Sequence, residues 1–192
     1  MNNKKLLLIV FILVALWQLY IPAKMIYDSE KTLFAGKEYK FKTAPIDPND
    51  PFRGKYIALR YEDNLTQVQN DENWTRNETI YIILSTDKDG YARIHSVSKS
   101  KPEDNSDFVK AKVSYHSNDN KNVNIDYPFN RFYMEESKAP AAEKVYSESL
   151  ADTTKVAYAL IYIKDGEAVI KDVLIDGVSI KEMVKSQQKN RK

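Results

Sequence analysis

The sequence contains no cysteine, and this absence excludes several kinds of site at once. A disulfide framework, a thiolate nucleophile, a zinc–thiolate centre and a lipid anchor attached through sulfur all require cysteine. Histidine is scarce as well, because His95 and His116 are the only two in the chain. Each lies in a segment predicted to be a strand, where a lone histidine is usually a structural residue. The sequence therefore predicts no metal site and no cofactor.

The chain also lacks a stripe of charge of one sign. It has 29 Lys and Arg against 27 Asp and Glu, a formal net charge of +2, and both signs are mixed along its length. Proteins that bind nucleic acid gather basic residues on one face, so this balance indicates no nucleic-acid partner. The one basic stretch, residues 183–192, is interpreted as a solvated tail, with contact to acidic lipid or a partner as the alternative.

Catalytic sequence motifs are missing too. The chain has no nucleophile elbow, no HExxH zinc motif, no P-loop and no GxGxxG glycine-rich loop. These absences favour a protein that works by binding over one that works by catalysis.

A long apolar run is present at the N-terminus. Residues 6–27 carry Gln18 and Lys24 as their strongly polar side chains. As a helix this segment is about 33 Å long, which matches a hydrocarbon core of about 30 Å if Lys24 reaches out to the interface. Interfacial aromatic residues and the lack of a small-residue cleavage site favour a retained signal anchor over a cleaved signal peptide.

The orientation of this segment follows from the charges that precede it. Lys4 and Lys5 lie in a five-residue N-terminus, and positively charged flanks tend to stay in the cytoplasm. The rest of the chain is therefore predicted to face the other compartment.

Beyond the apolar run, short segments alternate polar and apolar residues or, at residues 79–85, are nearly all apolar. Turn residues separate them, and this pattern is typical of β-strands. Eight strands are predicted, at residues 37–43, 56–62, 79–85, 91–98, 108–117, 122–127, 155–163 and 168–175. Such closely spaced strands without intervening helices indicate a mainly β (α+β) fold, an antiparallel β-rich ectodomain behind a transmembrane helix.

Some details of this organisation can be predicted as well. The first two strands are expected to share a sheet, residues 64–78 are expected to form a loop, and Asp165-Gly166 is expected to close a hairpin. One short helix is predicted outside the membrane, at Ala139–Leu150, where helix-forming residues follow Pro140.

The segment Gly54–Tyr61 reads GKYIALRY and resembles the motif that gives the GDYXXLXY protein family its name. The glycine, both tyrosines and the leucine stand at the spacing of that motif, whereas Lys55 replaces its acidic residue. The lead-in at residues 35–53 and two later blocks, 131–136 and 174–177, also resemble the family and occur in the same order.

The resemblance implies a bacterial, membrane-anchored protein without an assigned biochemical activity. Because such proteins tend to appear beside multi-pass membrane proteins, it suggests a multi-pass protein as a partner, in addition to the lipid bilayer around residues 6–27. The implied location is the bacterial inner membrane, with a single span and a periplasmic C-terminal domain. The predicted organisation is a cytoplasmic N-terminus (1–5), a transmembrane signal-anchor helix (6–27), a juxtamembrane linker (28–36), a GDYXXLXY-like β-rich domain (37–182) and a basic tail (183–192).

Two segments are predicted to form contact surfaces: the proline-punctuated turn and strand at residues 47–61, and the segment at 129–136. In the first, Asp47, Asp50 and Arg53 are interpreted as turn-capping and pairing residues that could also contact a polar ligand. Tyrosines in both segments could line a groove, although aromatic side chains that pack a sheet give the same pattern. The predicted binding residues are Asp47, Asp50, Arg53, Tyr56, Tyr61, Arg131, Phe132 and Tyr133.

The predicted function is that of a non-enzymatic accessory protein anchored in the membrane. The alternative is a hydrolase of the cell envelope that uses Asp47, Asp50 or a histidine. Arg53-Gly54 and the strand that follows also resemble a short stretch of type I signal peptidases, but no matching serine and lysine can be identified. A signal-peptidase-like scaffold without its catalytic dyad is therefore a further alternative.

Overall fold

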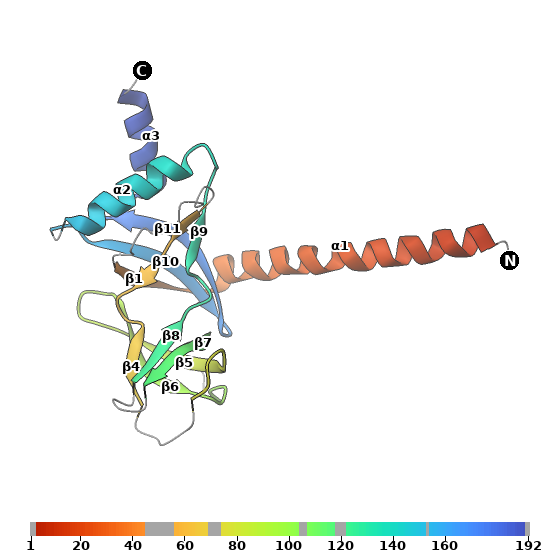
Figure 1. Ribbon diagram of the computed structural model, residues 1–192, viewed down its shortest axis with the longest axis horizontal. Coiled ribbons are helices and arrows are strands. Elements are labelled where there is room, and N and C mark those ends of the chain that lie inside the picture. The colour runs from red at the N-terminus through yellow and green to blue at the C-terminus, as the bar shows by residue number, and fades with distance from the viewer. Residues whose placement is uncertain are drawn as a thin grey trace.

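The computed structural model describes residues 3–44, 56–68, 74–103, 107–117, 122–152 and 154–190. A long helix, α1 (Asn3–Ala35), projects from a β-rich body (Figure 1). It is long and apolar enough to span a membrane or to act as a signal anchor. α1 continues through residues 28–35, so the segment predicted as a juxtamembrane linker is helical.

Gly36 joins α1 to the first strand at a point where two backbones nearly touch. Its N–H donates to the carbonyl oxygen of Thr32 at 2.9 Å. A Cβ atom at position 36 would lie 2.4 Å from that oxygen and 3.0 Å from the carbonyl oxygen of Ile163. Only glycine fits so close an approach. The end of α1 is thereby held against the sheet that contains Ile163.

That first sheet is antiparallel and has five strands. Its central pair is the predicted hairpin, in which Asp165 and Gly166 turn the chain with positive φ angles of 53° and 89°. In sheet order the strands are β12 (Val178–Ser179), β11 (Glu167–Ile175), β10 (Ala157–Lys164), β1 (Lys37–Ala44) and β3 (Arg60–Tyr61).

The second sheet also has five antiparallel strands. In sheet order they are β4 (Leu65–Gln67), β8 (Asn122–Asp126), β7 (Phe108–Ser117), β5 (Thr79–Thr86) and β6 (Ala92–Ser98). β4 lies within residues 64–78, which were predicted to be a loop. Three residues are too few to show an alternating pattern, and they become a strand because β8 offers them a free edge.

The predicted strand at residues 56–62 divides into two strands that join different partners. Ile57, Leu59 and Tyr61 share one buried face, as the alternation predicted. β3 pairs with β1, which confirms a shared sheet for this half. The other half, β2 (Tyr56–Ala58), instead pairs with β9 (Arg131–Tyr133) in a separate two-stranded sheet.

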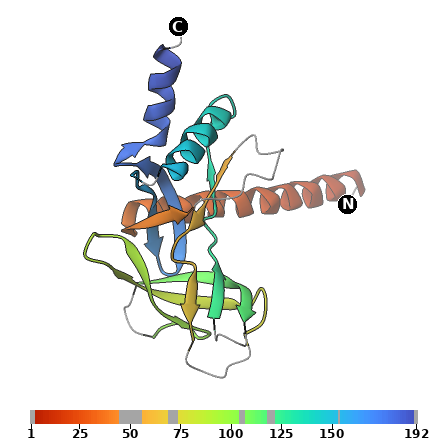
Figure 2. The ribbon, with the colours of Figure 1, turned by 60° about the vertical axis from the view of Figure 1, so that its left-hand side comes forward.

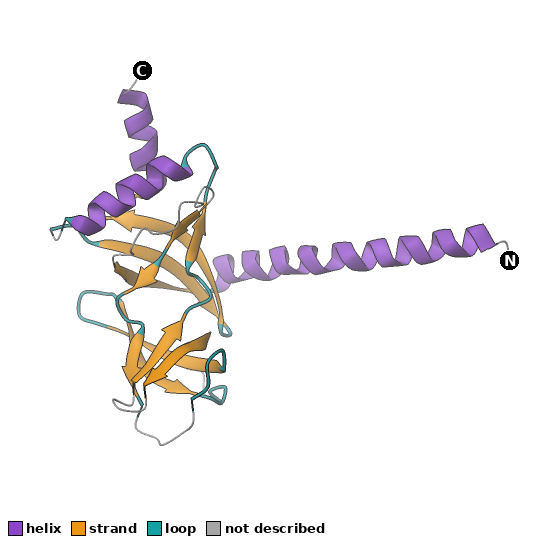
Figure 3. Ribbon diagram, viewed as in Figure 1, coloured by secondary structure: helices purple, strands orange, loops and turns teal. Residues whose placement is uncertain are grey.

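Two helices outside α1 cover one end of the body. α2 (Ala139–Ala151) was predicted, whereas α3 (Ile180–Asn190) lies largely within the segment interpreted as a basic tail. Ile180 and Val184, four residues apart, are fully buried, and one short apolar face is enough to order this helix on the body. α2 and α3 lie at the end of the body opposite the second sheet (Figure 3). The first sheet lies between these two helices and the second sheet (Figure 2).

These features confirm the predicted fold class, an N-terminal apolar helix followed by antiparallel sheets.

The core between the sheets is rich in aromatic rings. Phe41 of β1 lies 5.5, 5.6 and 5.1 Å, centroid to centroid, from Tyr61, Tyr127 and Phe129. All four side chains are buried.

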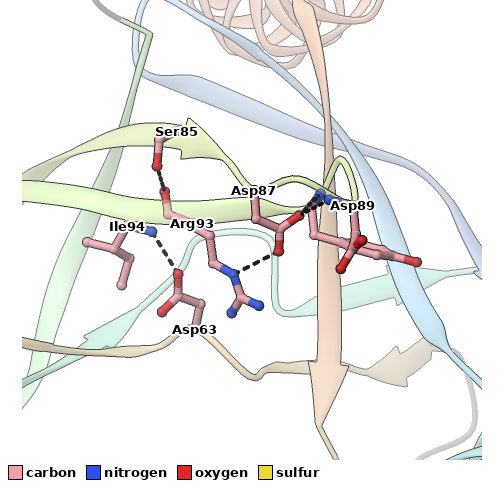
Figure 4. A network of polar contacts seen from close by, with 7 residues as sticks. Asp63, Ser85, Asp87, Asp89, Arg93 and Ile94 are labelled. Atoms are coloured by element: carbon pink, nitrogen blue, oxygen red, sulfur yellow. Dashed lines mark hydrogen bonds and ion pairs between the residues drawn. The ribbon is translucent and has the colours of Figure 1, made fainter.

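The hairpin of β5 and β6 is held by one carboxylate. Asp87 accepts the backbone N–H groups of Asp89 at 3.0 Å and Tyr91 at 2.9 Å, and the Arg93 side chain at 3.1 Å (Figure 4). Asp63 accepts the N–H of Ile94 at 2.7 Å in the same network. The three bonds to Asp87 lower its pKa below the ordinary value, and the bond from the Tyr91 N–H has the largest effect.

The lowered pKa predicts a pH-dependent effect of Asp87→Asn. A carboxyl group with a depressed folded pKa stabilises the protein above its unfolded pKa of about 3.9, and this stabilisation is lost as the pH falls through the folded pKa. The variant is therefore expected to unfold at lower denaturant concentration than the wild type at pH 7, with a smaller difference near pH 3. Asp89→Asn is the control, because its carboxylate accepts none of the three bonds. A difference that is the same at both pH values would contradict the prediction.

Candidate functional site

The two-stranded sheet of β2 and β9, here called the β2–β9 ribbon, brings together the two segments that were predicted as contact surfaces. Tyr56 pairs with Tyr133, Ile57 with Phe132, and Ala58 with Arg131. An isolated pair of strands is marginally stable in water, so the ribbon depends on packing against the body. Ile57 and Phe132 supply that packing, since they are 1% and 4% exposed.

Side chains alternate between the faces of a strand, so the neighbours of these two anchors point outward. The rings of Tyr56 and Tyr133 are 5.5 Å apart, and the guanidinium carbon of Arg131 lies 5.2 Å from the centroid of the Tyr56 ring. The Tyr133 side chain is 63% exposed. We call this group the Tyr56–Arg131–Tyr133 cluster.

The cluster carries a permanent positive charge. A polar contact with Tyr133 raises the pKa of Arg131 further above its already high value. The next carboxylate along the chain, Glu135, is engaged by Lys138, which lowers the pKa of Glu135. A second cation adjoins the ribbon, because the Lys181 ammonium of α3 lies 4.9 Å from the centroid of the Phe132 ring.

Two of the predicted binding residues lie in the core and not on this surface. Tyr61 is 3% exposed, and its hydroxyl donates to the carbonyl oxygen of Phe129 at 2.6 Å. Burial raises the pKa of Tyr61 well above its ordinary value, so the hydroxyl stays neutral. Phe132 is the buried anchor of β9. Tyr61 and Phe132 are therefore aromatic residues that pack the sheets.

The remaining predicted residues, Asp47, Asp50 and Arg53, lie outside the described residues. Among the described residues, the structure places Tyr56, Arg131 and Tyr133 together at the surface.

The histidines do not come together on neighbouring strands. His95 lies on β6 and His116 on β7, and β5 lies between these strands in the second sheet. His95 is exposed to solvent. Within the part of the chain that the structure describes, no three residues among His, Asp and Glu form a group that could hold a metal ion.

α1 meets the body at β10 and β11 of the first sheet. Sequence reasoning identified the members of the cluster one by one but missed their contact. The sequence did contain a signal for this contact: residues 56–58 and 131–133 are two short segments that each place a tyrosine next to a buried apolar residue.

A family model described as GDYXXLXY protein matches residues 18–173. The match runs from within α1 to β11 and includes both strands of the β2–β9 ribbon. The chain matches no curated protein and no solved structure.

Proposed function

Because this chain belongs to the GDYXXLXY protein family, we propose that it is a non-enzymatic binding protein, anchored by α1 in a bacterial inner membrane. Its body stands on the extracytoplasmic side and engages a multi-pass membrane protein through the Tyr56–Arg131–Tyr133 cluster. The observation that carries the proposal is the exposed cluster itself.

The composition of the cluster suits a protein interface. Tyrosine and arginine are enriched among the residues that dominate binding energy, because each offers a large contact area together with a polar group. Stacking of Arg131 on Tyr56 holds both side chains in place before binding, which reduces the entropy lost on association.

The placement of the cluster supports a partner in the same membrane. If residues 6–27 span the bilayer, residues 28–35 of α1 extend about 12 Å beyond it. The close contact at Gly36 fixes the end of this helix to the first sheet. The body that carries the cluster is then held close to the bilayer, where extracytoplasmic loops of a neighbouring membrane protein can reach it.

The proposal predicts that the double variant Arg131→Ala and Tyr133→Ala separates the complex. The test is co-purification, in mild detergent, of the full chain with a multi-pass membrane protein of the same cell. We expect recovery of the partner to fall about tenfold or more, since loss of about 1.4 kcal/mol or more of binding free energy lowers the affinity at least tenfold.

A matched control changes the same residue types elsewhere. Arg60 and Tyr115 are both exposed and belong to strands outside the ribbon, so Arg60→Ala with Tyr115→Ala should leave recovery unchanged. Equal recovery with both double variants and the wild type would show that the cluster is not the contact surface.

A further inference from the structure

A hollow of about 400 Å³ lies between the tip of the β10–β11 hairpin and the outer face of the second sheet. Three strands form its floor. Thr79 of β5 pairs with Lys112 of β7, and Lys112 pairs in turn with Asp126 of β8. These side chains therefore stand in one row across the sheet, with Lys110 two residues away on the same face.

The hairpin tip forms a wall that is fixed in place. The N–H of Lys110 donates to the carbonyl oxygen of Gly166 at 3.0 Å. Gly166 lies directly on the Phe108 ring, close enough that a Cβ atom would be 2.5 Å from the ring carbon Cε2. Glu167, the next residue, lines the hollow. The site is thus formed by two sheets that a backbone hydrogen bond joins.

The hollow carries charges of both signs. Lys110 and Lys112 are exposed, and neither ammonium group forms an ion pair or hydrogen bond with another described residue. Two carboxylates face them: Glu167, and Asp126, which accepts a hydrogen bond from the Asn130 amide at 3.3 Å. Two ammonium groups and two carboxylates complement a ligand that is itself zwitterionic.

The hollow also lies beside α1. α1 contacts β11, the strand that begins at Glu167. If residues 6–27 span the bilayer, this wall of the hollow stands beside the part of α1 that leaves the membrane, on the margin from which α1 projects (Figure 1). This step rests on the proposed anchoring by α1 and not on the proposed protein partner.

We propose that this hollow binds the headgroup of a phospholipid with a phosphate and a primary ammonium group, the phosphoethanolamine type. Lys110 and Lys112 contact the phosphate, and Asp126 and Glu167 accept hydrogen bonds from the ammonium group. The bound headgroup fixes the tilt of the body on the bilayer.

The test uses the full chain in detergent micelles doped with phosphatidylethanolamine, phosphatidylglycerol or phosphatidylcholine of matched acyl chains. Native mass spectrometry measures the fraction of protein that retains one lipid. We expect preferential retention of phosphatidylethanolamine, and at least about tenfold weaker retention after Lys110→Ala with Lys112→Ala. Asp126→Asn with Glu167→Gln should instead shift the preference toward the anionic phosphatidylglycerol.

Lys88→Ala with Asp89→Asn, in the turn between β5 and β6, removes one charge of each sign away from the hollow and should behave as the wild type. Equal retention of the three lipids, or wild-type retention by the double lysine variant, would overturn the proposal. Displacement of the lipid by equimolar glycerophosphoethanolamine would assign the site to a soluble zwitterion and overturn the membrane source. Neither outcome depends on Arg131 or Tyr133, so failure here is distinct from failure of the proposed partner contact.

Discussion

Replacing Phe41 with alanine is expected to lower the free energy of unfolding by about 3–5 kcal/mol, the range for truncating a buried aromatic ring. The Phe41 side chain is 2% exposed and contacts Tyr61, Tyr127 and Phe129 in edge-to-face geometry. These three residues come from β3 and from the connection between β8 and β9, so the ring joins segments from both sheets and the ribbon. Its loss leaves a cavity that rigid strands on both sides cannot close.

The measurement is denaturant unfolding of the full chain in mild detergent, followed by the fluorescence of Trp74, which is buried in the body. Phe34→Ala provides a matched control on α1. The Phe34 side chain is 92% exposed, so its truncation should change the free energy of unfolding by less than about 0.5 kcal/mol. Equal destabilisation by the two variants would contradict the central position of Phe41.

Gly166→Ala is expected to lower the free energy of unfolding by about 2–5 kcal/mol, because two costs coincide. Gly166 has a φ of +89°, and a side chain in a left-handed conformation costs roughly 1–2 kcal/mol. The new methyl group would also lie 2.5 Å from the Phe108 ring, and overpacking of this kind costs about 1–3 kcal/mol.

Gly177→Ala separates these two costs. Gly177 has a similar φ of +83°, but a Cβ atom there would meet no heavy atom within 4 Å. Only the conformational cost of roughly 1–2 kcal/mol is expected, measured by the same unfolding experiment. If the two variants lost the same stability, the Phe108 contact would make no contribution.

Local patterns in the sequence are sufficient for most elements of this fold. The strands β1 and β7 were predicted from alternating residues, β5 from a nearly all-apolar run, and β11 from the hairpin turn before it. β4, β9 and α3 were not predicted. Each has too few apolar residues for a periodic signal and is ordered by contacts with distant parts of the chain.

The candidate site was only partly predictable for a related reason. Alternation showed that Tyr56 and Ile57 point to opposite faces, but not which face the body covers. Phe132 and Tyr133 were not predicted to lie in a strand at all. Once Ile57 and Phe132 are buried, both tyrosines must face outward, and the register of β2 with β9 then brings Arg131 onto Tyr56.

The sequence by itself determined the apolar helix, the mainly β fold and the absence of cysteine chemistry, because composition and periodicity are local properties of the chain. Only the tertiary structure decided which surfaces form. β2 pairs with a strand more than 70 residues away, and the hairpin tip at Gly166 docks on a strand more than 50 residues before it. Such contacts depend on how well the faces of two sheets pack against each other. The free energy of this packing is a property of both partners, so no single segment of the sequence reveals it.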